Sequence, residues 1–445
     1  MHLVIIGNGI TGITAAITAR RLAADARITL VAAESAHHYA RPALMYLYLG
    51  HLRYADVKPY EDWFWAENRL ELVHAEATGV DTAARTVQLA TGDSLAYDCL
   101  LLATGSVVRT AGWPGQQLHG VQGFYGLPDL ESMSRATQGI RHAVVVGGGL
   151  IGVELAEMLH SRGIRVTWLV REQRYWQSVL PPEESALLAA HIRRHDIDFR
   201  VATELREVLG DAQGCVRAVV TTTGQELPAE WVGLATGVQP NLTLARAAGL
   251  ETDQGILVNA LLATSASGVY AAGDCAQHRQ PAPGEVAVEQ LWYTGRMQGE
   301  TVAHTICGQP TPYRRGQWFN SAKFFQLEYQ TYGRVPAQPA PGIASFCWQH
   351  PTGKHLLRIN FRQSDHAVTG VNALGLRQRQ HVWERWLGEH TPIGVVLAQL
   401  AAANFDAEFS RQHEPAIRRE FARQFPDLPL AAAPRRRGLF GVRLG

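Results

Sequence analysis

Short apolar runs that stop at a glycine or an acidic residue are the first pattern in this chain. Residues 3–6 are aliphatic and lead directly into glycine, and the alanine-rich stretch up to residue 24 has the composition of a helix. A second apolar run, residues 28–33, ends at Glu34. Runs this short are typical of strands that are buried in a sheet. The order therefore predicts a strand, a helix and a second strand.

The same order returns near residue 143. Residues 143–146 predict a buried strand, residues 153–162 a helix, and residues 166–170 the next strand. Further strands are predicted at 97–103 and 268–272, and both end beside a glycine. Strands that alternate with helices predict the α/β fold class, with one Rossmann-like dinucleotide-binding domain around each repeat.

The last third of the chain has a different pattern. Short strands are predicted at 319–325, 345–348 and 356–361, and helices at 378–387 and 393–403. We assign three tryptophans of this region to the core: Trp348, Trp383 and Trp386. From residue 426 the composition changes to proline, alanine and arginine, which predicts a flexible basic tail over 426–445. The arginine run 435–437 indicates a solvated terminus, and no nucleic-acid-binding fold surrounds it.

Length and composition indicate a globular protein of two or three domains. Of the 445 residues, 46% are hydrophobic and 18% charged, which excludes disorder for most of the length. No window approaches 18 uninterrupted apolar residues, so we expect no transmembrane helix. The opening apolar run lacks a basic region and a cleavage site, so we interpret it as a first strand. We therefore expect a cytoplasmic protein.

The net charge of +1 conceals a difference between two parts of the chain. Residues 1–312 carry 23 basic and 31 acidic residues, whereas residues 313–445 carry 18 basic and 9 acidic residues. The five cysteines are scattered, with no CxxC pair. That spacing argues against a metal site, an iron–sulfur cluster or a local redox disulfide within the chain.

The two glycine turns carry the clearest chemistry. Gly7-Asn8-Gly9-Ile10-Thr11-Gly12 and Gly147-Gly148-Gly149-Leu150-Ile151-Gly152 both have the spacing GxGxxG between a strand and a helix. Such a turn lets a pyrophosphate approach the N–H groups of the helix N-terminus, although glycines often serve a tight turn alone. Glu34, at the end of the next strand, can accept hydrogen bonds from the ribose hydroxyls. Two dinucleotides in one chain suggest a flavin and a nicotinamide.

Five motifs in this order resemble those of the two-dinucleotide flavoprotein reductases, the pyridine nucleotide–disulfide oxidoreductase superfamily. They are the two glycine turns, Ala103-Thr104-Gly105, Ala235-Thr236-Gly237 and residues 268–274. The resemblance implies an FAD-binding domain over 1–112 and 247–312, an NAD(P)-binding domain over 113–246, and a C-terminal α+β interface domain over 313–425. It further implies that FAD contacts Gly7, Gly9, Ile10, Thr11, Gly12, Glu34, Ser35, Arg41, Pro42, Ala103, Thr104, Gly105, Gly273, Asp274, Leu291 and Trp292. For NAD(P)H it implies Gly147, Gly149, Leu150, Ile151, Gly152, Arg171 and Gly237.

The segment after Glu34 departs from the disulfide reductases. Residues 39–46 contain no cysteine, so a flavin here cannot pass electrons to a protein disulfide. Their Tyr-x-Arg-Pro-x-Leu pattern is instead similar to that of rubredoxin and ferredoxin reductases, in which the Arg-Pro segment lies near the flavin. Arg41 can also be a surface arginine, and Pro42 an ordinary helix start.

In those relatives a lysine pairs with a glutamate near the flavin. The resemblance places Glu154 as the glutamate and puts Tyr46 at the lysine position, so that the ion pair is either lost or completed by Lys58 from farther along the chain. Glu154 can equally be an ordinary helix residue. Arg171 favours NADP(H) and Glu172 favours NAD(H), and we lean slightly to NADP(H). Leu291 and Trp292 precede a helix expected to point at the flavin, although core packing explains them nearly as well.

The sequence thus predicts an FAD-dependent NAD(P)H oxidoreductase that passes a hydride to the flavin and then electrons to an external acceptor. An iron–sulfur protein or partner subunit is the first expectation for that acceptor. The alternatives are a quinone reductase at the membrane surface and a flavin-binding structural or redox-sensing subunit of a larger complex. We expect a homodimer or a part of a larger complex, and no nucleic acid partner.

Overall fold

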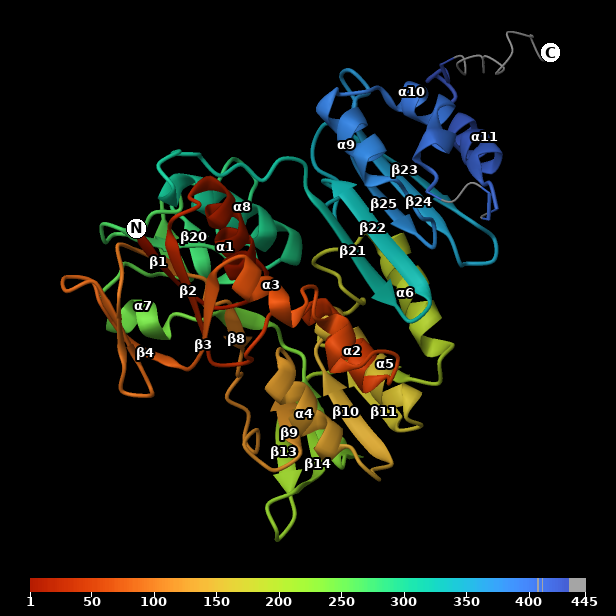
Figure 1. The fold of residues 1–445 in the computed structure, drawn as a ribbon. Coiled ribbons are helices and arrows are strands. Elements are labelled where there is room, and N and C mark those ends of the chain that lie inside the picture. The colour runs from red at the N-terminus through yellow and green to blue at the C-terminus, as the bar shows by residue number, and fades with distance from the viewer. Residues whose placement is uncertain (406–407, 410, 432–445) are drawn as a thin grey trace. The chain divides into compact units, whose positions relative to one another are not determined.

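The structure is a computed structural model that describes residues 1–405, 408–409 and 411–431. The chain forms two compact units, coloured by residue number in Figure 1. Unit 1 comprises Met1–Thr167 and Leu205–Arg315, and unit 2 comprises Trp168–Glu204 and the chain from Gly316 onward. The predicted limits of the FAD-binding and NAD(P)-binding domains stay predictions. None of the described helices is long and apolar enough to cross a membrane.

A five-stranded parallel sheet forms the first layer of unit 1. Its order is β19 (Val269–Ala271), β7 (Cys99–Leu102), β1 (His2–Ile6), β2 (Arg27–Ala32) and β3 (Leu70–His74). Leu3, Val4 and Ile5 are fully buried, since the central strand β1 is covered on both faces. This burial explains the uninterrupted apolar run of the sequence.

Helices α1 (Ile10–Leu22) and α8 (Trp292–Ile306) pack closely against each other beside this sheet (Figure 1). The contact depends on small residues. A Cβ atom added to Gly299 of α8 would lie 2.4 Å from the carbonyl oxygen of Thr11, and Ala15 and Ala19 of α1 are fully buried. The alanine-rich composition of α1 therefore permits the close approach of α8.

A second parallel arrangement in unit 1 repeats the first. Strand β10 (His142–Val146) pairs with β16 (Trp231–Leu234), which pairs with β9 (Val121–Gly123). Helix α5 (Leu150–Ser161) follows β10, and β11 (Arg165–Leu169) runs across the limit between the units. The predicted α/β class with parallel Rossmann-like sheets is confirmed by these two arrangements.

Smaller elements complete unit 1. Two three-stranded antiparallel sheets consist of β4 (Ala77–Asp81), β5 (Thr86–Leu89) and β6 (Ser94–Ala96), and of β13 (Leu205–Gly210), β14 (Val216–Thr221) and β15 (Glu226–Pro228). Two strand pairs join β8 (Ser106–Val108) to β17 (Val238–Pro240) and β18 (Ile256–Val258) to β20 (Ala276–His278). The short helices are α2 (Leu44–Tyr48), α3 (Asp62–Glu67), α4 (Leu127–Ala136) and α7 (Thr243–Ala247).

Unit 2 contains a five-stranded antiparallel sheet. Its order is β21 (Phe319–Phe324), β22 (Leu327–Gly333), β25 (Val368–Leu374), β24 (Leu356–Arg362) and β23 (Ile343–Gln349). Helices α9 (Gln380–Gly388), α10 (Ile393–Ala398) and α11 (Glu414–Gln424) contribute to its hydrophobic core. This unit also holds α6 (Pro182–Arg193) and β12 (Asp198–Arg200). Trp348, Trp383 and Trp386 are buried, as predicted.

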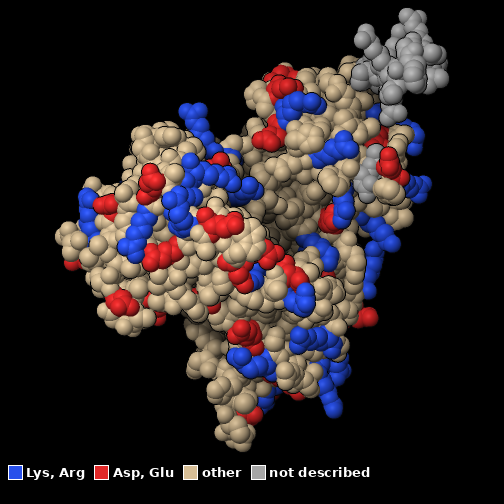
Figure 2. Space-filling view, viewed as in Figure 1, with Lys and Arg blue, Asp and Glu red and all other residues tan. Residues whose placement is uncertain are grey.

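The predicted tail begins with residues that contact this core. Leu428 and Leu430 pack against the hydrophobic cluster of unit 2. Four of the arginines that give the last third its positive charge, Arg435, Arg436, Arg437 and Arg443, lie outside the described residues. On the face shown in Figure 2, basic and acidic side chains are interspersed.

A buried ion pair network crosses unit 2. The guanidinium of Arg358 in β24 donates to Glu184 at 2.6 and 3.0 Å, to Glu183 at 2.6 Å and to Ser345 at 2.8 Å. The side chain of Glu184 is 0% exposed and that of Arg358 is 8% exposed. Removing one partner of such a network leaves a buried charge without its counter-charge.

We expect Arg358→Leu to lower the free energy of unfolding by about 3–5 kcal/mol, because two carboxylates then lose their cation. Urea unfolding followed by tryptophan fluorescence measures this loss. Arg362→Leu on the same strand is the matched control. The partner of Arg362, Asp365, is exposed. Arg362→Leu should therefore lower the free energy of unfolding by less than about 1 kcal/mol. Equal losses in the two variants would contradict a buried network.

Candidate functional site

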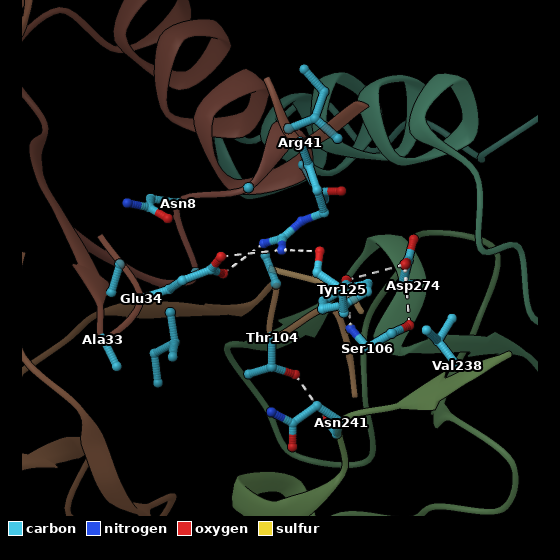
Figure 3. Close-up of a pocket in the computed structure, with 18 of the residues that line it drawn as sticks. Asn8, Ala33, Glu34, Arg41, Thr104, Ser106, Tyr125, Val238, Asn241 and Asp274 are labelled. Carbon is cyan, nitrogen blue, oxygen red and sulfur yellow. Dashed lines mark hydrogen bonds and ion pairs between the residues drawn. The ribbon is translucent and has the colours of Figure 1, made fainter. Parts of the chain in front are cut away.

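A cavity of about 790 Å³ lies in unit 1 where β1, β2 and β7 end. Carboxyl ends of parallel strands are the usual place for a ligand in this kind of sheet. Figure 3 shows the polar side chains that surround this cavity. It brings together these predicted residues: Gly7, Gly9, Ile10, Thr11, Glu34, Arg41, Pro42, Ala103, Thr104, Gly105, Ile151, Glu154, Asp274, Leu291 and Trp292.

The first glycine turn borders this cavity. Gly7 has a φ of +112°, and a Cβ atom there would lie 2.1 Å from the carbonyl oxygen of Ala103. At Gly12 a Cβ atom would lie 1.9 Å from the carbonyl oxygen of Gly7. Gly9 differs, because a Cβ atom there would meet nothing within 4 Å. Gly9 is also the N-cap of α1 and has no side-chain capping bond, so the helix N-terminus is open for an anion.

The second glycine turn has the same geometry. Gly147 has a φ of +122°, and its Cβ atom would lie 2.2 Å from the carbonyl oxygen of Ala235. Gly149 is the N-cap of α5, has no side-chain capping bond, and has nothing within 4 Å of an added Cβ atom. Ala103 and Ala235 both begin an Ala-Thr-Gly sequence, and Gly237 has a φ of +97°. Unit 1 therefore contains two glycine turns of equivalent geometry, and their predicted contact with a pyrophosphate stays a prediction.

A cluster of charged and aromatic side chains surrounds Glu34 (Figure 3). Arg41 Nη2 donates to Glu34 Oε2 at 2.7 Å and Arg41 Nη1 to the carbonyl oxygen of Tyr125 at 2.8 Å. The guanidinium also lies 4.3 Å from the centroid of the Tyr125 ring. Burial alone would raise the pKa of Glu34, but the charge and hydrogen bonds of Arg41 and Tyr39 hold this pKa below its usual range. Arg41 is thus a lining residue of the cavity.

The two oxygens of the Glu34 carboxylate are unequally occupied by the protein. Oε1 accepts three hydrogen bonds, from Tyr39 Oη, from Arg41 Nη1 and from the N–H of Leu127, whereas Oε2 accepts one, from Arg41 Nη2. Each oxygen of a carboxylate offers about two lone-pair positions. A ribose hydroxyl can therefore donate to Oε2 while the protein's own donors stay in place.

A second polar group surrounds Asp274. Its Oδ2 atom accepts hydrogen bonds from Ser106 Oγ at 3.1 Å and from Tyr125 Oη at 3.5 Å. Burial raises the pKa of Asp274, while Ser106 and Arg41 oppose that rise. Gln290 Nε2 donates to Ser106 Oγ at 2.8 Å. Sequence reasoning missed Tyr125, Ser106 and Gln290, because no spacing or motif distinguishes them.

Helix α5, which begins in the second glycine motif, also contributes Ile151 and Glu154 to the lining of the cavity. Burial, and then the nearby charge of Glu157, raise the pKa of Glu154 to about 7. Among the described residues no cation pairs with Glu154. The charge of this lining carboxyl group therefore changes near neutral pH.

The other two residues predicted beside Glu154 are not among those that line the cavity. Lys58 Nζ binds Asp62 at 2.6 Å, so its ammonium group is held by a carboxylate four residues further along the chain. Tyr46 stacks on His51 with ring centroids 6.3 Å apart. It belongs to α2, which contacts α5, the helix of Glu154.

The remaining predicted residues have supporting or separate positions. Ser35 is buried, and its carbonyl oxygen accepts from Asn8 Nδ2 at 2.8 Å, which braces the first glycine turn. His38, missed by sequence reasoning, is buried and contacts the carbonyl oxygen of Asn8 at 2.8 Å. Arg171 belongs to unit 2, and its exposed guanidinium lies 3.5 Å from Glu172. Its role toward the nicotinamide nucleotide stays a prediction.

Known proteins resemble this chain over most of its length. A model of the pyridine nucleotide-disulphide oxidoreductase family matches residues 1–299. A rubredoxin-NAD(+) reductase of Ectopseudomonas oleovorans is 29% identical over 314 residues, 70% of this chain and 81% of that protein. The ferredoxin–NAD(+) reductase component of a biphenyl dioxygenase system from Paraburkholderia xenovorans is 32% identical over 311 residues, 70% of this chain and 76% of its own.

A solved structure agrees with these sequence matches. A ferredoxin reductase from Rhodopseudomonas palustris superposes with a TM-score of 0.77 at 25% identity. The superposition covers 84% of this chain and 91% of that one. It therefore extends beyond the part of the chain that the family model matches.

The glycine turns allow a test that separates ligand binding from folding. We expect Gly9→Ala to weaken FAD binding roughly tenfold or more, because the added methyl group occupies the open cradle. The melting temperature of the apoprotein should stay unchanged, since nothing surrounds that Cβ atom. Fluorescence titration with FAD and thermal unfolding provide the two readouts.

Gly149→Ala is the matched control for this test. It should raise the KM for NAD(P)H and leave FAD affinity as it is. Gly7→Ala, in contrast, should destabilise the apoprotein, because its Cβ atom collides with Ala103. Unchanged FAD affinity in Gly9→Ala would show that the first glycine turn does not bind FAD.

The raised pKa of Glu154 predicts a pH-dependent stability. The folded protein favours the neutral carboxyl, so this contribution is complete below pH 4.5 and is lost as the pH rises to about 7. At pH 8 the loss reaches up to about 3 kcal/mol, since each pKa unit corresponds to about 1.4 kcal/mol. Glu154→Gln should therefore stabilise the apoprotein relative to wild type at pH 8 more than at pH 4.5.

Urea unfolding of the apoprotein at both pH values measures this difference. Glu131→Gln, on an exposed position of α4, is the control and should shift stability equally at the two pH values. If Glu154→Gln behaved like that control, Glu154 would be ionised with an ordinary pKa.

Proposed function

The chain belongs to the pyridine nucleotide-disulphide oxidoreductase family, and from that premise we propose that it is an FAD-dependent NAD(P)H:acceptor oxidoreductase. One observation carries the proposal. A single cavity is lined both by the first glycine turn and by Ile151 and Glu154, which follow the second glycine turn. Residues of the two dinucleotide-binding motifs therefore meet at one place.

The residues of the cavity fit FAD. The open N-terminus of α1 at Gly9 would hold the pyrophosphate, and Glu34 would hold the ribose through Oε2. Asp274, Ser106 and Tyr125 would bind hydroxyl groups of the chain between phosphate and ring system. Bound FAD supplies the chemistry that accepts two electrons from NAD(P)H and releases them to an acceptor.

Two features of the chain would act on the flavin ring system of bound FAD. Helix α8 begins at Trp292 beside the cavity and has no side-chain cap at Leu291, so its positive dipole end can stabilise negative charge there. Glu154 holds a proton near neutral pH in the same cavity. We assign Glu154 a catalytic role as the group that keeps or releases this proton beside the ring system.

The electron acceptor is a separate molecule. All five cysteines are free, and none of them lines the cavity. Residues of this chain therefore provide no disulfide to which electrons could pass. Relatives of the chain are named reductases of rubredoxin and ferredoxin. We propose an iron–sulfur protein, or a partner subunit that carries such a centre, as the acceptor.

Several finer points are part of the same proposal. The protein is cytoplasmic, and it forms a homodimer or a part of a larger complex. The names of the relatives contain NAD(+), which favours NADH as the electron donor. Arg171, at the position predicted to contact the adenosine ribose, favours NADPH instead. An iron–sulfur partner with an acidic surface would suit the basic last third of the chain.

An anaerobic mixing experiment tests the function. We expect the protein to be purified with FAD and its absorbance near 450 nm to be bleached within about seconds by either NADH or NADPH, at rates typical of enzymes. A plant-type ferredoxin or a rubredoxin added afterwards should restore the absorbance. Ubiquinone in liposomes is the control acceptor.

The outcomes distinguish the three functions that the sequence allowed. Slow bleaching by both nucleotides would contradict an enzyme and favour a structural or redox-sensing subunit. Reoxidation by liposomal quinone alone would favour a quinone reductase. The faster nucleotide decides between NADH and NADPH.

A further inference from the structure

Glu289 is a buried carboxylate that the site described above does not use. Its side chain is 1% exposed. It precedes Gln290, Leu291 and Trp292, which line the cavity, and it lies between β20 and α8, where the chain forms neither helix nor strand. A buried charge in an irregular segment is costly unless it is paired, so its partners indicate what it holds in place.

Three donors surround the Glu289 carboxylate. Arg315 Nη1 donates to Oε1 at 3.1 Å, Tyr313 Oη to Oε2 at 2.7 Å and Gln298 Nε2 to Oε2 at 3.2 Å. Arg315 also binds Glu285 at 3.2 Å. These contacts fasten the irregular segment both to α8, through Gln298, and to the chain after α8.

Gln298 continues this network toward the cavity. It is 0% exposed, and its Oε1 atom accepts the N–H of Gly273 at 2.7 Å. Gly273 has a φ of +79° and precedes Asp274, which lines the cavity. Gln290 is connected to the carboxylate of Asp274 through Ser106, because Gln290 donates to Ser106 Oγ and Ser106 Oγ donates to Asp274. The turn that carries Asp274 is therefore held by two consecutive residues, Glu289 through Gln298 and Gln290 through Ser106.

The chemistry of a carboxylate sets the direction of the Gln298 amide. An ionised carboxylate only accepts hydrogen bonds, so it draws the NH₂ group of Gln298 and turns the amide oxygen toward Gly273. In the opposite orientation two N–H groups would face each other at Gly273, and two oxygens would face each other at Glu289. A neutral amide at position 289 would offer both a donor and an acceptor, so that the N–H of Gly273 alone would select the orientation.

We propose that Glu289 is a positioning residue for FAD, which fixes Gln298 and thereby the Gly273–Asp274 turn and the N-terminus of α8. The proposal rests on the proposed function, since it assumes that FAD occupies the cavity. Glu289 itself does not line the cavity, so it acts through the residues that it holds.

Glu289→Gln tests the proposal, with Glu184→Gln as the matched control. Glu184 is also a fully buried carboxylate paired with an arginine, but it lies in unit 2 and does not line the cavity. We expect both variants to lose thermal stability. Only Glu289→Gln should also raise the dissociation constant for FAD, by roughly tenfold. Only this variant should alter the flavin absorption spectrum and make the midpoint potential more negative.

Hydrogen exchange provides a readout that does not need FAD. In the apoprotein the Gly273 amide should exchange faster in Glu289→Gln than in wild type and in Glu184→Gln, because its acceptor, Gln298, is then held less firmly. Gln298→Leu should reproduce the change in FAD affinity, and the double variant should be no worse than either single variant.

The outcomes separate this inference from the proposed function. A wild-type protein that binds no FAD would overturn the proposed function, and with it the role assigned here. FAD binding by wild type, with affinity, spectrum, potential and Gly273 exchange all unchanged in Glu289→Gln, would overturn the positioning role alone. A shift of the same kind in Glu184→Gln would also overturn it, because the effect would then be general destabilisation.

Discussion

The close approach of two backbone segments at each glycine turn is the constraint on which the rest of the site depends. Gly7 faces the carbonyl oxygen of Ala103, and Gly147 faces that of Ala235, at distances that leave no room for a side chain. In each case the turn after one strand is pressed against the end of its parallel neighbour. That contact directs the helix N-terminus past the sheet edge, so that a ligand can reach it.

The parts of the fold set by local chemistry could be predicted from the sequence. The glycine spacing marks turns that only glycine permits, and the run at residues 3–6 marks a strand buried on both faces. Helices α9 and α10 begin within two residues of their predicted positions, because their apolar spacing is regular. Within the site, the predicted lining residues are those of the motifs themselves.

The parts set by tertiary contacts could not be predicted. Strand β25 was missed because it contains Gly370 and the buried Asn372, whose polar side chain is satisfied by Tyr329 and Glu184 from distant elements. Tyr125 lies in a segment without a pattern and enters the cavity because it contacts Arg41 and Ser106. The lysine position of the relatives falls on Tyr46, and Lys58, the cation expected in its place, is held by Asp62.

The unequal occupation of the two Glu34 oxygens has a consequence for how the cofactor enters. Oε1 already accepts three donors of the protein, whereas Oε2 accepts only Arg41 Nη2. A ribose hydroxyl can bind at Oε2 while the Arg41–Glu34 pair stays intact. Cofactor uptake then does not wait for this pair to open, and its observed rate should rise with FAD concentration without a plateau set by the pair.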